Sequence, residues 1–134
     1  MAEELLVGEQ LTPDMIKSGE FLIAALDKLN LLVKSAFWLL LPDQHVWRLV
    51  IASPEVRLSG PKAVYRKVVS ALRRLPSEVS PIGAKDISVV EDKDPLVVML
   101  GSIISTEPGV SGIRFSRSVI NGQMIEDAYL YRSA

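Results

Sequence analysis

Apolar residues recur at helical spacing between positions 12 and 30 of the chain. Thr12-Pro13-Asp14 is a typical helix start, because the hydroxyl can cap the first turn, proline suits the first helical position and an acid favours the positive end of the helix dipole. One face of this helix is apolar, and further apolar residues widen it on both sides: Met15, Leu22, Leu26 and Leu29, with Ile16, Phe21, Ile23 and Ala25. Because only a narrow face is polar, we expect the helix to be covered on more than one side, by its own sheet or by a second subunit.

Two short apolar runs follow and predict an antiparallel hairpin. Ala36–Leu41 is continuously apolar, as in a strand buried on both faces, and Val46–Ala52 alternates around Arg48. The polar residues between them form the turn. Trp38 and Trp47 fall in this hairpin, and we expect them to pack in the core or at a dimer contact, with an aromatic binding surface as the alternative.

The middle of the chain predicts a second helix, a short strand and a further apolar element. The helix at 59–75 begins with Ser-Gly-Pro and ends before Pro76. Ile87–Val90 has the length and composition of a strand. Residues 96–104 fit a buried helix or a buried strand by periodicity, and the Asp94-Pro95 cap in front of them favours the helix.

The C-terminal part of the chain predicts a second hairpin with a defined register. Two apolar runs, 113–120 and 123–131, flank Asn121-Gly122, the pair preferred in a two-residue type I′ turn because both central residues need positive φ. Such a turn pairs the residues on either side of it, and each further pair follows outward along the strands. In this register Arg117 faces Glu126, which is a favourable cross-strand charge pair.

The order of elements is helix, hairpin, helix, strand, helix, hairpin. We therefore expect an α+β fold in which two antiparallel β-hairpins, about five strands in all, form a mainly antiparallel sheet packed against two to three helices. Because 134 residues fit one domain and no linker or repeat interrupts the pattern, residues 1–134 are expected to form a single domain.

Composition narrows the classes of function. The chain has no cysteine, which excludes thiol catalysis, disulfides and thiolate metal sites, and a single histidine, His45, which excludes a multi-histidine metal site. Glycine motifs of nucleotide-binding proteins are missing, so we expect no cofactor. The acidic N-terminus and the lack of a membrane-length apolar run predict a cytoplasmic protein with no membrane partner. Apolar residues make up 49% of the chain and its mean hydropathy is +0.27, which favours a homodimer, with a well-filled core as the alternative.

Positive charge is concentrated in the predicted helix at 59–75. Residues 56–85 carry seven basic side chains and one acidic one, although the whole chain has a net charge of −1. Five cations lie away from the apolar face of this helix: Lys62, Arg66, Lys67, Arg73 and Arg74. Such a strip can neutralise phosphates or carboxylates, so the leading hypothesis is a non-catalytic binding protein whose cationic helix face meets an acidic protein or a nucleic acid. The alternative is an ordinary solvated face, or one that meets the acidic N-terminal segment.

A divalent-metal nuclease is the competing hypothesis. Some metal-dependent nucleases hold the ion between two carboxylates at strand ends and use a lysine to assist the attacking water. Asp43 in the first turn, with Glu91 and Lys93 after the short strand, supplies these residue types, and Glu20 is a further candidate ligand. The carboxylates of Asp43 and Glu91 must come within about 5 Å to share an ion, because metal–oxygen bonds are about 2.0–2.6 Å long.

Two segments of the chain resemble a known group of proteins. Ala36–Ala52 (AFWLLLPDQHVWRLVIA), with the Gly60-Pro61 and Val64-Tyr65 pairs that follow it, and Ser116–Arg132 (SRSVINGQMIEDAYLYR) are similar to a family of small conserved-hypothetical bacterial proteins. The resemblance covers most of the chain. It implies a bacterial cytosolic origin and carries no activity, cofactor or catalytic residue.

Overall fold

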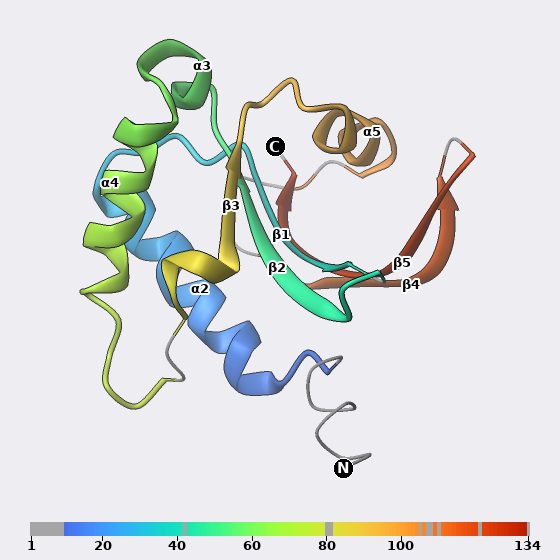
Figure 1. Ribbon diagram of the computed structural model, residues 1–134, viewed down its shortest axis with the longest axis horizontal. Coiled ribbons are helices and arrows are strands. Elements are labelled where there is room, and N and C mark those ends of the chain that lie inside the picture. The colour runs from blue at the N-terminus through green and yellow to red at the C-terminus, as the bar shows by residue number, and fades with distance from the viewer. Residues whose placement is uncertain are drawn as a thin grey trace.

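The computed structural model describes residues 10–41, 43–79, 82–104, 106, 109, 111–120 and 122–133. Helices and strands alternate in the order that the sequence predicts, with one short helix added after the first hairpin. The elements are α2 (Pro13–Lys28), β1 (Ser35–Leu41), β2 (Val46–Ala52), α3 (Glu55–Ser59), α4 (Pro61–Leu72), β3 (Ile87–Val90), α5 (Pro95–Ile103), β4 (Ile113–Ile120) and β5 (Gln123–Ser133), with a single 3₁₀ turn at Ala84–Asp86 before β3 (Figure 1).

One five-stranded sheet runs through the molecule in the order β3-β2-β1-β5-β4. The β1–β2, β1–β5 and β4–β5 pairs are antiparallel, whereas β2 and β3 are parallel. The α+β class is therefore confirmed, and the sheet is mixed rather than purely antiparallel. The parallel pair arises because α3 and α4 carry the chain from the end of β2 back to the start of β3, the crossover that parallel neighbours require.

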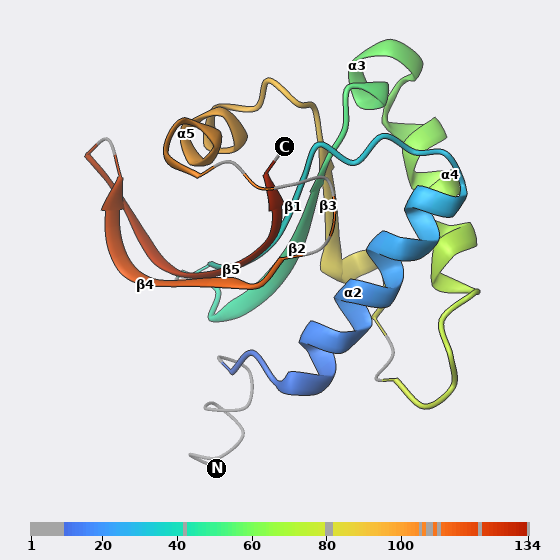
Figure 2. The ribbon, with the colours of Figure 1, turned by 180° about the vertical axis from the view of Figure 1, so that it is seen from behind.

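Helices α2 and α4 lie side by side against one face of the sheet (Figure 2). Leu22, Ile23 and Leu26 of α2 are fully buried, together with Val68 of α4 and Trp38 of β1. Most of the apolar surface of α2 is thus covered by its own sheet and by α4, whereas Phe21 remains 39% exposed.

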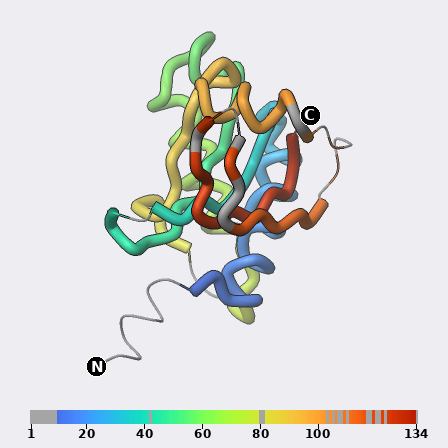
Figure 3. The backbone as a smooth tube through the Cα atoms, turned by 90° about the vertical axis from the view of Figure 1, so that its right-hand side faces the viewer, coloured from blue at the N-terminus to red at the C-terminus, as the bar shows by residue number. Residues whose placement is uncertain are grey.

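Helix α5 covers the opposite face, where the β4–β5 hairpin bends up beside it (Figures 1 and 3). Its first turn is capped by Asp94, whose carboxylate accepts a hydrogen bond from the backbone N–H of Leu96 at 3.0 Å. Val97 and Leu100 are buried against Phe37 of the sheet. The cap therefore decides correctly between helix and strand for the apolar segment that begins at position 96.

Both hairpins are antiparallel as predicted, and the second has the predicted register. Leu41 pairs with Val46 next to the first turn, and Ile120 pairs with Gln123 next to the second. Gly122 has a φ of 80°, as the second position of the two-residue turn requires. Asn121 and the side chain of Arg117 lie outside the described residues, so the expected Arg117–Glu126 charge pair stays a prediction.

A buried tyrosine hydroxyl joins three elements that are far apart in the sequence. The indole N–H of Trp38 in β1 donates to the hydroxyl of Tyr131 in β5 at 2.9 Å, and this hydroxyl donates to the backbone carbonyl of Ile16 in α2 at 2.6 Å. Burial raises the pKa of Tyr131 above its ordinary value, so the phenol stays protonated. Trp38 and Trp47 are 2% and 6% exposed, which places both rings in the core and contradicts the aromatic binding surface.

Glycine at position 19 allows α2 to approach the tyrosine closely. A Cβ added at Gly19 would overlap the Tyr131 hydroxyl and lie 2.7 Å from its ring carbon Cζ. A Cβ added at Gly101 in α5, by contrast, would only reach ordinary contact with Ser133 Oγ at 3.7 Å. The same substitution should therefore have opposite effects in the two helices.

We expect Gly19→Ala to lower the free energy of unfolding by about 1–3 kcal/mol, because the added methyl group must displace the tyrosine or the helix. Gly101→Ala should raise it by about 0.5–1 kcal/mol, since alanine favours a helix interior over glycine. Urea denaturation followed by circular dichroism measures both. An equal response of the two variants would contradict the close approach of α2 to Tyr131.

Candidate functional site

The cationic residues lie on α4, whose opposite face is buried. Gly60 precedes the helix with a φ of 90°, and Pro61 occupies the first helical position. Val64, Val68 and Ala71 are buried at i, i+4 and i+7 against the sheet and α2. The helix therefore turns its remaining face outward, and four cations on or just after this face are exposed: Lys62, Arg66, Arg73 and Arg74.

Three of these cations line one groove along the outer face of α4. The groove has a volume of about 490 Å³ and is lined by Lys62, Tyr65, Arg66, Val69, Ser70 and Arg73. None of the described residues in this lining carries a carboxylate. At a rise of about 1.5 Å per residue, Lys62 and Arg66 are about 6 Å apart along the helix axis, and Arg66 and Arg73 about 10 Å.

The floor of the groove is fixed by a hydrogen bond to the sheet. The Tyr65 hydroxyl donates to the backbone carbonyl of Ile87 in β3 at 3.3 Å, and Tyr65 is half-buried. The same carbonyl accepts from the guanidinium of Arg48, which also donates to Ser88. The aromatic ring is therefore held in place beneath the cationic side chains.

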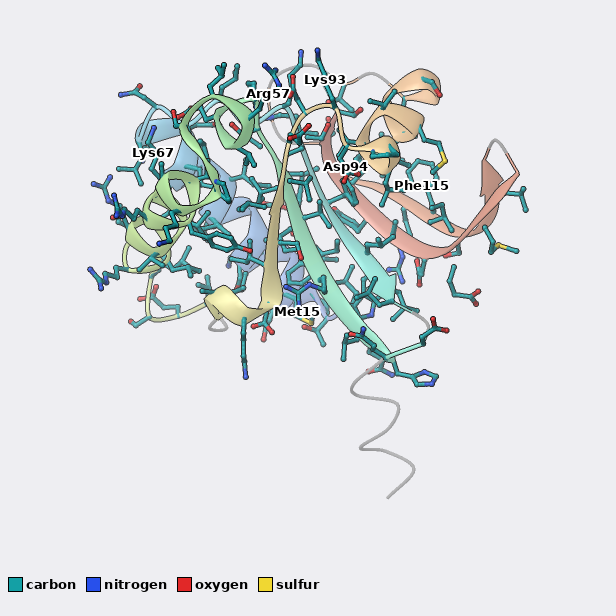
Figure 4. The ribbon with its side chains drawn as sticks, turned by 45° about the horizontal axis from the view of Figure 1, so that its top comes forward. Met15, Arg57, Lys67, Lys93, Asp94 and Phe115 are labelled. Carbon is teal, nitrogen blue, oxygen red and sulfur yellow. The ribbon has the colours of Figure 1, made fainter. Side chains whose placement is uncertain are left out.

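Lys67 differs from the other cations of α4. Its ammonium group lies 3.0 Å from the Glu55 carboxylate, which also accepts a hydrogen bond from the backbone N–H of Leu32. The Leu32 bond and the nearby lysine hold the pKa of Glu55 below its ordinary value. In the same region Arg57 is paired with Asp92 at 3.2 Å. Lys67 and Arg57, both labelled in Figure 4, thus have carboxylate partners within the molecule.

The remaining predicted binding residues differ from Lys67 in their surroundings. Within the described part of the chain, Lys62, Arg66, Arg73 and Arg74 form no ion pair with a carboxylate. Arg74 lines a neighbouring hollow of about 330 Å³ together with Phe21 and Lys28 of α2. The exposed cationic surface therefore extends from α4 toward the end of α2.

The residues of the nuclease hypothesis are not brought together. Asp43 precedes β2, and Glu91 follows β3, whose last residue pairs in parallel with the last residue of β2. The seven residues of β2, at about 3.3 Å each, therefore put roughly 20 Å between the two carboxylates. Lys93 lies at the Glu91 end, beside Arg57 (Figure 4). Among the described residues, no cluster of three histidine, aspartate or glutamate side chains could hold a metal ion.

Three uncharged groove residues were missed by the sequence reasoning. Tyr65, Val69 and Ser70 follow Lys62 at i+3, i+7 and i+8, and the cations Arg66 and Arg73 follow it at i+4 and i+11. This is the spacing of one helix face. That periodicity was the available signal. The apolar pattern alone places Tyr65 on the buried side of the helix. Its place in the groove could not be predicted, because it depends on a tertiary contact, the hydrogen bond to β3.

No family model matches the chain, and no curated protein and no solved structure matches it. The resemblance to a bacterial family therefore stays a prediction. In the ranges that the structure describes, every helix is too short or too polar to cross a bilayer.

The Glu55–Lys67 pair predicts a defined pH dependence of stability. A carboxyl group with a lowered pKa in the folded state stabilises the fold above its unfolded pKa of about 4.5, and this contribution is lost as the pH falls. Glu55→Gln should therefore lower the free energy of unfolding by up to about 1 kcal/mol at pH 7 and by less at pH 3. Glu78→Gln is the matched control, because Glu78 is exposed and makes no ion pair with the described residues. Parallel losses for both variants at both pH values, measured by urea denaturation, would contradict this role.

Proposed function

We propose that this protein is a small, non-catalytic binding protein whose α4 face binds an anionic macromolecule, either an acidic protein or a nucleic acid. The observation that carries this proposal is the groove lined by Lys62, Arg66 and Arg73, in which no described lining residue carries a carboxylate. Cations that already have internal partners are poor sites for an outside anion, and these three have none among the described residues.

The chemistry of the groove favours binding. Arginine keeps its charge at all physiological pH values, and its planar group donates two parallel hydrogen bonds to a phosphate or a carboxylate. Tyr65 and Val69 add an apolar floor beneath the charges. A volume of about 490 Å³ accommodates part of an extended chain, such as a few nucleotides or acidic residues.

We also infer that the protein acts as a homodimer. Its mean hydropathy is high for a soluble chain, and several large apolar side chains remain more than half exposed in one copy, among them Val98, Val119 and Met124. These residues lie on α5 and on the β4–β5 hairpin, away from α4. A dimer formed there leaves the cationic face accessible.

The binding proposal is tested by measuring affinity across a salt series. Fluorescence anisotropy with short single-stranded DNA, single-stranded RNA and a poly-glutamate peptide gives the dissociation constant for each probe. With three phosphate contacts, the logarithm of the association constant should fall with the logarithm of salt concentration with a slope of about −2 to −3. A preference for one probe identifies the class of partner, and weak binding of all probes that does not depend on salt would refute the proposal.

Variants of α4 separate the groove cations from the paired lysine. The double variant Arg66→Glu/Arg73→Glu should weaken binding by about tenfold or more and make the salt slope less steep by about one for each phosphate interaction that is removed. Lys67→Ala is the matched control on the same helix, because the Lys67 ammonium group is already held by Glu55. It should change the affinity less than the double variant and leave the slope unchanged. An equal decrease in affinity for both would show that the groove has no special role.

A further inference from the structure

The outer edge of β4 is long, and no other described strand pairs with it. In the described part of the chain, β4 is hydrogen-bonded to β5 alone and forms one edge of the sheet. It has eight residues and contains no proline, whereas the opposite edge strand, β3, has four. A long edge strand without such protection is a template for pairing with another strand.

The register of the hairpin determines which backbone groups point outward. Ile120 and Gln123 flank a two-residue turn, so they form a hydrogen-bonded pair, and every second residue of β4 from Ile120 backward does the same with β5. The N–H and C=O groups of the residues between them therefore face away from β5. These residues are Ile113, Phe115, residue 117 and Val119.

Three of the outward-bonding residues, Ile113, Phe115 and Val119, have their side chains on the apolar face of the hairpin. Ile113 and Phe115 pack against the core on the α5 side of the sheet. Val119, on the same face by alternation, is 66% exposed, and Met124 opposite it is 55% exposed. Free backbone groups and uncovered apolar side chains thus coincide along one edge.

We propose that this edge pairs with the same edge of a second copy, so that two β4 strands run antiparallel around a twofold axis at Ser116. The proposal rests on the inferred homodimer and names its surface. Around this axis Ile113 lies opposite Val119 of the second copy, and Phe115 lies opposite residue 117 of the second copy. All outward N–H and C=O groups of both strands then find partners, and the two sheets become one continuous sheet.

This register keeps the two copies of Arg114 apart. Arg114 is held on the other face by two contacts of 2.6 Å to the Asp127 carboxylate, and it lies over the Trp47 ring at 5.5 Å. In the symmetric register the two Arg114 residues are offset by four positions, or about 13 Å along the strands. A second copy therefore fits because each half of the edge complements the other half.

Cross-linking tests the position of the axis. Across the twofold, the two copies of residue 116 form a pair without mutual hydrogen bonds, with Cα atoms about 4.5 Å apart, which suits a disulfide. Because the chain has no cysteine, Ser116→Cys introduces the only thiol. We expect mild oxidation to give a covalent dimer of twice 14.7 kDa on a non-reducing gel. Ser59→Cys, an exposed serine at the end of α3, is the control and should stay largely monomeric.

A charge substitution tests the contact itself. Val119→Lys places two ammonium groups beside the new strand pair and should weaken dimerisation by about tenfold or more. Leu58→Lys makes a similar change at a side chain that is 72% exposed on α3 and should leave dimerisation unchanged. Light scattering coupled to size exclusion at micromolar concentration measures both, and circular dichroism checks that the variants fold.

The outcomes distinguish this inference from the homodimer itself. A monomer mass for the unmodified chain would overturn both. A dimer that persists in Val119→Lys, together with no cross-link through Ser116→Cys beyond the Ser59→Cys control, would overturn the β4 edge and leave the homodimer standing. Binding of anionic probes by α4 is measured separately and depends on neither result.

Discussion

The arrangement of this molecule depends on the hydroxyl group of Tyr131. The group accepts a hydrogen bond from Trp38 and donates one to the carbonyl of Ile16, so a single buried oxygen fixes α2 against the two central strands of the sheet. A buried phenol or indole without a hydrogen-bond partner would destabilise the fold, and the site therefore specifies one position for α2. The next residue, Arg132, adds a second attachment, because its buried guanidinium binds both carboxylate oxygens of Asp27 on α2.

The position of α2 in turn determines which side chains of α4 are exposed. Helix α4 lies beside α2 on the same face of the sheet, so Val64, Val68 and Ala71 are directed inward and its cations outward. The groove forms because Tyr65 is hydrogen-bonded to β3 while Lys62, Arg66 and Arg73 line the groove around it. The cationic surface and the core are thus two sides of one helix, and the buried side packs against α2, the helix that Tyr131 positions.

Local signals predicted most of the fold, and contacts between distant residues account for the rest. The Asp94 cap and the two-residue turn before Gln123 each act within a few residues, and the structure has the helix and the register that they predict. The parallel pairing of β3 with β2 has no local signal, because it depends on where a crossover of more than 30 residues returns. The cationic face was predicted from helical spacing alone. Helical spacing could not predict which of these cations is neutralised, since the partner of Lys67 lies on a separate short helix.

The sharp bend at Gly60 has a consequence for the electrostatics of the surface. The bend folds α3 back on α4, so that a glutamate twelve positions earlier reaches Lys67. Glycine adopts this backbone conformation without steric cost, whereas other residues resist it. A side chain at this uncharged position would strain the bend that brings Glu55 to Lys67. Neutralisation of the Lys67 charge therefore depends on the backbone geometry of a residue that carries no charge itself.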